Sequence, residues 1–184
     1  MAPSVPTHFT KVADTEVHQG FRFRVHEVRY RSPTGEEFDR DVVRHPGAVA
    51  VVPLHDDGTV TLVRQFRAAL DAELLELPAG LRDVEGEPDE LTAGRELMEE
   101  AGLAATHLEH LVTFCNSPGF CDETVGVFLA TGLTEVPDDR QGVEEEAMTI
   151  ERIALSDALA MVDDGRITDA KTIIGLTLTA ARRS

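Results

Sequence analysis

Residues 80–103 read GLRDVEGEPDELTAGRELMEEAGL, and they hold the first clear helix pattern of the sequence. Pro88 suits the first helical position and Gly102 suits a helix end, so we predict a helix between these two residues. At about 100° per residue, Glu96, Glu99 and Glu100 share one face of this helix. The opposite face, which we expect to pack into the core, consists of Leu91, Leu97, Met98 and Ala101.

The acidic face points to a bound cation. Carboxylates at these spacings repel one another by roughly 0.2–0.5 kcal/mol per pair, so the cluster gains no stability by itself. Mg²⁺ takes hard oxygen ligands and usually recruits one or two carboxylates, several waters and the phosphates of a substrate. The loop at residues 77–80 contains a glycine, which would let a backbone carbonyl approach the same ion. Arg95 can hold a neighbouring carboxylate by a bidentate hydrogen bond.

This stretch resembles the signature of the Nudix hydrolase superfamily. That signature reads Gly, five residues, Glu, seven residues, then Arg-Glu-U-X-Glu-Glu-X-Gly-U, where U is a bulky aliphatic residue. Residues 87–103 match it throughout. Six residues, not five, separate Gly80 from Glu87, which we interpret as a one-residue insertion in the loop. A solvated acidic helix is the alternative, but a match at so many fixed positions seldom arises by chance.

The resemblance implies a role for each residue of the motif. Glu96 and Glu100 would be the main metal ligands, Glu99 a further or water-mediated ligand, and the carbonyl of Ala79 another. The residues with mainly structural roles would be Gly80, Glu87, Arg95 and Gly102. Two or three Mg²⁺ ions are expected, for which Mn²⁺ can substitute.

A second acidic cluster consists of Glu144, Glu145 and Glu146, close to residues 136–142, which we predict to form a flexible loop. On the residues alone, three consecutive glutamates are usually a solvated surface. The cluster is similar to the acidic loop of relatives that hydrolyse ADP-ribose, which implies that one of these glutamates activates the attacking water. Glu145 is the first candidate, with Glu144 and Glu146 as close competitors. A mobile loop suits a base that moves in with substrate.

Further residues are candidates for substrate binding. Pro118 stands sixteen residues beyond the final glycine of the motif, which resembles the ADP-ribose pyrophosphatase subgroup. A Pro-Gly pair alone is typical of a turn. The resemblance implies that Gly119 and Glu123 lie near the terminal ribose of the substrate.

Arg64 and Arg67 place positive charge at the end of a strand that leads towards the predicted site. Surface ion pairing is the alternative for each of them. Arg67 is similar to the phosphate-binding arginine of the family, and Glu76 is similar to a residue that touches the adenosine portion of the substrate.

The composition limits the possible partners. The chain has 184 residues with 34 acidic and 17 basic side chains, a formal charge of -17 that disfavours nucleic acid and anionic membranes. No secretory signal is visible, and no apolar stretch reaches the roughly 20 residues that span a bilayer, so we expect a cytoplasmic protein. The spacing of Cys115 and Cys121 matches neither a zinc site nor a redox motif.

The remaining patterns predict a mixed α/β protein. Residues 21–30 and 38–44 form a predicted hairpin around the turn at Ser32-Pro33-Thr34-Gly35. Further strands are predicted at residues 47–54, 59–66, 109–114 and 124–130. Two more helices are predicted at residues 156–163 and 169–183, with Ser156 and Asp169 as N-caps.

The resemblance implies the complete architecture and assembly. Residues 47–184 would form a Nudix-type α/β/α sandwich with a mixed sheet, and residues 1–46 an antiparallel β-strand extension used for dimerisation. We expect a homodimer held by residues such as Phe21 and Phe23, in which both subunits line each site.

The predicted function is metal-dependent hydrolysis of the pyrophosphate bond of ADP-ribose to AMP and ribose 5-phosphate. Hydrolysis of another nucleoside diphosphate compound, such as a GDP-sugar or a dinucleoside polyphosphate, is the first alternative. A module that senses ADP-ribose without cutting it is the second. The motif glutamates are complete, which favours catalysis over sensing.

Overall fold

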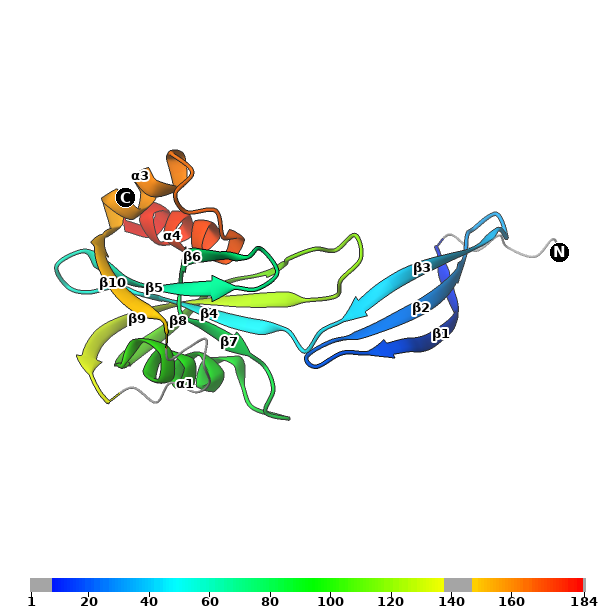
Figure 1. The fold of residues 1–184 in the computed structure, drawn as a ribbon, viewed down its shortest axis with the longest axis horizontal. Helices are drawn as coiled ribbons and strands as arrows, with labels where there is room; N and C mark the ends of the chain where they lie inside the picture. Colours follow the sequence, from blue (N-terminus) through cyan, green and yellow to red (C-terminus); the bar gives the residue numbers. More distant parts are fainter. Residues whose placement is uncertain (1–7, 138–146, 184) are drawn as a thin grey trace. The chain divides into compact units, whose positions relative to one another are not determined.

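A computed structural model describes residues 8–137 and 147–183 of the chain (Figure 1). The chain divides into two compact units. One unit combines the N-terminal strands with Cys115–Thr124, and the other contains Ala48–Phe114 and Val125–Ser184. Each unit has its own sheet structure, and the acidic helix belongs to the second.

The larger unit is built around β4 (Ala48–Pro53), which is buried along almost its whole length. Side chains on a strand point to alternate faces. Val49 and Val51 accordingly pack in one apolar cluster with the acidic helix, whereas Ala50 and Val52 pack in another with the two C-terminal helices. Helices therefore cover both faces of the strand layer (Figure 1), which confirms the predicted α/β/α sandwich.

Two sheets make up the strand layer of this unit. The first has the order β7-β4-β9-β8, in which β4 is parallel to β9 (Thr124–Glu135) and antiparallel to β7 (Ala79–Leu81). Its other edge strand is β8 (Leu103–Cys115). The second sheet has the order β10-β5-β6 and is antiparallel. Its strands are β5 (Thr59–Arg67), β6 (Ala72–Glu76) and β10 (Thr149–Ala154).

The acidic helix, α1 (Asp89–Ala101), begins after Pro88 and ends at Gly102 with a left-handed φ of 62°, a backbone conformation that favours glycine. The predicted division of its faces is wrong in part. Leu91 and Met98 are 62% and 42% exposed rather than packed in the core. The buried residues of α1 instead include glutamates and a threonine as well as apolar side chains: Thr92, Ala93, Glu96, Leu97, Glu100 and Ala101.

The C-terminal helices are α3 (Leu155–Asp163) and α4 (Ala170–Arg183). The backbone N–H of Thr172 donates to Asp169 Oδ2 at 3.0 Å, so Asp169 caps α4 as predicted. The predicted cap at Ser156 is wrong, because α3 follows Ala154 and has no side-chain cap. Among the described residues, no helix has the length and apolar character to cross a membrane.

The smaller unit contains an antiparallel sheet of three strands rather than a hairpin of two. The strands are β1 (Thr10–Gln19), β2 (Arg24–Arg31) and β3 (Glu37–Arg44). Every residue of β1 is exposed, and Val28 is the one buried residue described in the three strands. The N-terminal antiparallel strands were predicted, but β1 was missed because it lacks an apolar face to reveal it.

The segment Cys115–Thr124 belongs to the same unit as this sheet. The N–H of Val43 donates to the Phe120 carbonyl at 2.7 Å, and the N–H of Asp122 donates to the Val43 carbonyl at 3.1 Å. Arg44 also pairs with Asp122 at 3.1 Å. These bonds extend β3 with a stretch of chain that lies far from it in sequence.

Candidate metal and substrate site

The first part of the site is the edge formed by β7. The N–H of Ala79 donates to Glu100 Oε2 at 2.8 Å and therefore faces α1 rather than β4. The N–H and C=O of one strand residue point to the same side in an antiparallel pair, so the carbonyl of Ala79 is directed towards α1 as well. The predicted loop at residues 77–80 thus ends in a short edge strand, and it presents the carbonyl beside a carboxylate.

Glu96 and Glu100 are buried under this edge. They are 8% and 3% exposed. A Cβ atom at Gly80 would overlap with the carboxylate of Glu96, so only glycine permits this approach. Burial raises the pKa of Glu96 to about 7, against the opposing effect of Arg95. The carboxylates predicted as metal ligands are thus held away from bulk water.

Arg95 is the centre of the acidic cluster. Its Nη1 lies 2.7 Å from Glu96 and 2.9 Å from Glu99. Its Nη2 lies 3.5 Å from Glu87 and 3.6 Å from Asp83. Four carboxylates thus surround one guanidinium, and the excess of negative charge is what a bound cation would balance.

Glu87 reaches this cluster despite the extra residue between it and Gly80. Its carboxylate also accepts a hydrogen bond from the Thr92 hydroxyl at 2.8 Å, which ties the loop to the first turn of α1. Arg82 pairs with Asp89 at 2.7 Å in the same region. The extra residue therefore changes only the loop, and the spacing of the glutamates on α1 is unchanged.

The chemistry of the donor set fits a divalent cation. Within residues 8–137 and 147–183, no three acidic, histidine or cysteine side chains converge closely enough to hold a metal by themselves. Mg²⁺ needs only one or two carboxylates when waters and substrate phosphates complete its shell. Glu96, Glu99, Glu100 and the Ala79 carbonyl supply oxygen atoms only, which is the ligand type that Mg²⁺ selects.

A second charged group lies on β5, β6 and α4. Arg67 donates to both carboxylate oxygens of Glu76, at 2.8 and 2.6 Å, and Lys171 also donates to Glu76. Burial of Glu76 opposes its charged form, but the hydrogen bond from Arg67 and the charge of Lys171 outweigh it, so the pKa of Glu76 lies below its ordinary value. With an exposure of 1%, Glu76 is enclosed by these two cations.

The two predicted substrate arginines lie on opposite faces of β5. Arg67 shares a face with Glu76, whereas Arg64 is three residues away and points to the other face. Arg64 instead pairs with Glu151 on β10 at 2.6 Å. The hydrogen bond to Glu76 raises the pKa of Arg67, and the charge of Glu100 adds to this effect, so Arg67 lies within electrostatic reach of a carboxylate of α1.

The remaining predicted residues belong to the smaller unit or lie outside the described residues. Gly119 and Glu123 belong to the smaller unit, where Glu123 accepts from Asn116 at 2.8 Å and lies 3.3 Å from His45. The three candidate bases, Glu144, Glu145 and Glu146, lie outside the described residues, as do residues 138–142 of the predicted loop.

Four residues were missed by the sequence patterns. Asp83 joins the cluster around Arg95. Lys171 encloses Glu76, Thr172 accepts the backbone N–H of Leu77 beside it, and Asp169 accepts from the Thr172 hydroxyl. Asp169 was recognised only as a helix cap. Nothing in the local sequence links residues 169–172 to β6, which lies about a hundred positions earlier.

Comparison with known proteins assigns the family. The model of the NUDIX domain matches residues 43–173, more than half of the chain. The protein therefore belongs to the NUDIX family, as the motif in α1 predicted. Hydrolases of this family depend on divalent metal ions.

Among curated relatives, an ADP-ribose pyrophosphatase of Mycobacterium tuberculosis is 42% identical over 168 residues, which cover 91% of this chain and 81% of the relative. An ADP-ribose pyrophosphatase of Bacillus subtilis is 38% identical over 161 residues, which cover 88% and 86%. A crystal structure of an ADP compounds hydrolase matches the fold with a TM-score of 0.83 at 23% identity, covering 96% of this chain and 94% of that one.

Proposed function

We propose that this protein hydrolyses the pyrophosphate bond of ADP-ribose to AMP and ribose 5-phosphate, in a reaction that depends on Mg²⁺. The observation that carries the proposal is the buried carboxylate pair Glu96 and Glu100, held against the edge at Ala79 and Gly80. A buried pair of carboxylates beside a backbone carbonyl suits a cation that also binds a polyanionic substrate. The names of the two similar bacterial pyrophosphatases support ADP-ribose as that substrate.

In this proposal, Glu96, Glu99, Glu100 and the Ala79 carbonyl hold two or three Mg²⁺ ions, and Mn²⁺ can substitute. When bound, the cations neutralise phosphate oxygens and make a water more acidic. Arg95 keeps the carboxylates aligned by its contacts with Glu96 and Glu99. Gly80 leaves room for the Glu96 side chain.

Arg67 is the proposed phosphate-binding arginine. Its guanidinium is fixed by two hydrogen bonds to Glu76, and its side chain is 38% exposed. A preorganised guanidinium loses little freedom on binding an anion. The carboxylate of Glu76 is enclosed by Arg67 and Lys171, so Glu76 contributes to substrate binding by orienting these two cations. Roles in substrate binding for Arg64, Gly119 and Glu123 stay predictions.

The base that takes the proton from the attacking water is proposed to be Glu145, with Glu144 and Glu146 as alternatives. The support for this choice is the resemblance of the acidic segment to that of ADP-ribose-hydrolysing relatives. Replacing each glutamate with glutamine in turn separates the three. We expect one variant to lose at least about 100-fold in kcat, which is the size of a general-base contribution, and the other two to keep most activity.

The substrate is tested with a panel of nucleoside diphosphate compounds. Purified protein with Mg²⁺ is incubated with ADP-ribose, a GDP-sugar and a dinucleoside polyphosphate, and a phosphatase releases phosphate from the products. We expect ADP-ribose to give the highest kcat/KM, with AMP and ribose 5-phosphate as products. A GDP-sugar that reacts ten times faster would contradict the proposed substrate. Binding of ADP-ribose without turnover would instead favour the sensor.

The metal site is tested with a matched pair of variants. Glu100→Gln removes a buried carboxylate that faces Ala79, whereas Glu90→Gln removes an exposed one from the first turn of the same helix. We expect Glu100→Gln to lose most activity with the fold intact, and Glu90→Gln to match the unmodified protein. Addition of a chelator should abolish turnover, and Mg²⁺ should restore it. Near-native turnover by Glu100→Gln would contradict the ligand assignment.

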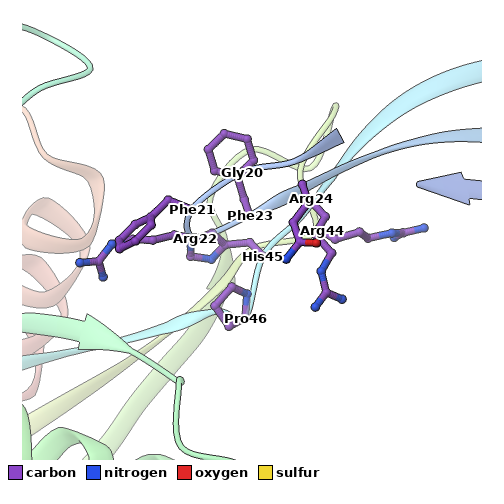
Figure 2. A pocket seen from close by; sticks show the side chains of 9 residues that line it. Gly20, Phe21, Arg22, Phe23, Arg24, Arg44, His45 and Pro46 are labelled. Carbon is purple, nitrogen blue, oxygen red and sulfur yellow. The ribbon is translucent and has the colours of Figure 1, made fainter. Parts of the chain in front are cut away.

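We also propose a cytoplasmic homodimer in which residues 1–46 form the dimerisation extension and residues 47–184 the hydrolase domain. The support is the exposed apolar surface of the smaller unit, where Phe21 is 95% exposed and Val17 is 58% exposed. Phe21 and Phe23 also line a pocket of about 410 Å³ with Arg22, Arg24, Arg44 and His45 (Figure 2). A small sheet with almost no buried residue gains its stability by packing on another surface.

Light scattering after gel filtration tests the dimer. We expect a mass near twice that of the 20.1 kDa chain, and a lower mass for Phe21→Ser at micromolar concentration. Leu91→Ser is the control, since it removes an apolar side chain that is also largely exposed but belongs to α1. A monomer in the unmodified protein would contradict the proposal.

A further inference from the structure

The first turn of α4 holds the chain that leads into the proposed metal site. The hydroxyl of Thr172 donates to Asp169 Oδ2 at 2.6 Å and accepts the backbone N–H of Leu77 at 2.8 Å. Thr172 is fully buried, and its donor and its acceptor are therefore both engaged. Asp169 in turn is fixed by the Thr172 N–H at 3.0 Å and by Lys171 at 3.1 Å.

Three successive residues, 77–79, lead into the proposed metal site, and each of them is hydrogen-bonded to a different element. Leu77 is bonded to Thr172 of α4, and the Pro78 carbonyl accepts the N–H of Val51 in β4 at 2.9 Å. Ala79 is bonded to Glu100 of α1. The position of the Ala79 carbonyl is therefore set by three elements that meet at this connection, and two of them, β4 and α4, lie outside the motif.

Side-chain packing keeps α4 at the distance that these bonds need. A Cβ atom at Gly175, one turn beyond Thr172, would lie 2.7 Å from Leu77 Cδ1 and 2.9 Å from Val52 Cγ2. Distances under 3.0 Å are essentially absent between real Cβ atoms and their neighbours. The glycine thus lets α4 approach the connection closely enough for the Thr172 hydroxyl to reach the Leu77 amide.

We propose that Thr172, supported by Asp169, is a positioning residue for the metal site. It acts through the backbone of Leu77 on the Ala79 carbonyl and on the hydrogen bond between Ala79 and Glu100. This inference rests on the proposed function, because it takes the Ala79 carbonyl and Glu100 as cation ligands. Residues that hold metal ligands in place typically change metal affinity by 10–100-fold when they are replaced.

The test compares three threonine variants. Thr172→Val keeps the shape of the side chain but removes the hydroxyl, and Thr172→Ser restores it. Thr179→Val is the matched control: Thr179 is also fully buried on α4, but its hydroxyl has no hydrogen-bond partner among the described residues. Binding of Mn²⁺ is measured by calorimetry without substrate, and exchange of the Leu77 amide proton is measured by NMR without metal.

We expect Thr172→Val to weaken Mn²⁺ binding at least about tenfold and to speed exchange of the Leu77 amide. Thr172→Ser should stay within about threefold of the unmodified protein in both measurements. Thr179→Val should equal it. A folded Thr172→Val protein with unchanged Mn²⁺ affinity would overturn the proposal, as would an equal loss in Thr179→Val, which would reveal a general effect of α4.

A second variant covers the case in which Thr172→Val does not fold. Asp169→Ala removes the acceptor that orients the Thr172 hydroxyl but keeps the hydroxyl itself, and it should weaken Mn²⁺ binding by about threefold or more. Unchanged affinity in this variant would overturn the proposal. Turnover of ADP-ribose by the unmodified protein is measured in parallel. Mn²⁺ binding without turnover would defeat the proposed function, yet the comparison of variants would still decide the role of Thr172.

Discussion

Gly80 and Glu96 are so close that no side chain fits between them. A Cβ atom at Gly80 would overlap with the carboxylate of Glu96, which is itself 8% exposed and contacts Arg95. Glycine is thus favoured at position 80 because the side chain of the proposed ligand Glu96 occupies the place of a Cβ atom. The backbone φ of Gly80 is not in the left-handed region.

Gly80→Ala is therefore expected to displace Glu96 and to lower kcat/KM for ADP-ribose by at least about tenfold. Mn²⁺ affinity measured without substrate should fall in parallel. Gly94→Ala serves as the control, because its Cβ would meet only Leu108 Cδ1, at an ordinary 3.7 Å. Unchanged activity in Gly80→Ala would mean that Glu96 can take another position at no cost.

The stability of the metal-free protein should depend on the charge of Glu96. Burial raises its pKa from 4.5 to about 7. Between these values the folded state binds more protons than the unfolded state, so stability falls as pH rises. The loss between pH 5 and pH 8 is at most about 3 kcal/mol. Urea unfolding in the presence of a chelator should show this slope in the unmodified protein and a flatter one in Glu96→Gln. Parallel slopes would be evidence against the raised pKa.

The buried and exposed ion pairs of β5 should differ in their effect on stability. Glu76→Gln leaves Arg67 and Lys171 without their buried counter-charge, which costs about 3 kcal/mol or more. Glu151→Gln breaks the pair with Arg64, but Glu151 is 33% exposed where Glu76 is 1% exposed, so the cost should be less than about 1 kcal/mol. Chemical unfolding at pH 7 measures both. Equal losses would contradict the enclosure of Glu76.

The stabilising effect of Glu76 should also depend on pH. Its folded pKa lies below the ordinary value of 4.5, so its contribution is fully present above pH 4.5 and is lost as pH falls through the lower, folded value. The difference in stability between the unmodified protein and Glu76→Gln should therefore be constant at neutral pH and shrink on acidification. A difference that grows towards acid would contradict the direction of the shift.

Replacing two helical glycines with alanine should affect the stability of the protein differently. Alanine is favoured over glycine in a helix by about 1 kcal/mol. At Gly94 the new Cβ meets ordinary contact distance, so Gly94→Ala should raise the stability by up to this amount. At Gly175 the new Cβ would lie 2.7 Å from a buried leucine, and overpacking costs about 1–3 kcal/mol. Gly175→Ala should therefore be neutral or destabilising. Thermal unfolding of both proteins decides this, and equal gains would refute the tight packing of α4.

Much of the larger unit was predictable because its signals are local. Pro88 and Gly102 bound α1 as predicted, and Asp169 caps α4. Burial on both faces of β4 follows from its continuous apolar sequence. In contrast, β1 has no buried face, so its sequence carries no alternation to detect.

Two differences between the sequence patterns and the structure have identifiable causes. The helical wheel of α1 placed the core opposite the carboxylates, but the edge at Ala79 and Gly80 covers the carboxylates, and Leu91 and Met98 on the opposite side are exposed. Arg64 and Arg67 were grouped because they are close in sequence. Their odd separation on a strand places them on opposite faces, a consequence of the two-residue period that was available from the sequence.

The amino-acid sequence alone determined the acidic motif, its helical spacing and the family, since these depend on residues within a few turns of one another. Only the tertiary structure decided that Glu96 is buried against Gly80, that Glu76 is enclosed by Arg67 and Lys171, and that Thr172 holds Leu77. The last two contacts with α4 join residues 95 positions apart. Such contacts are set by how the layers pack, and no short-range pattern in the chain encodes them.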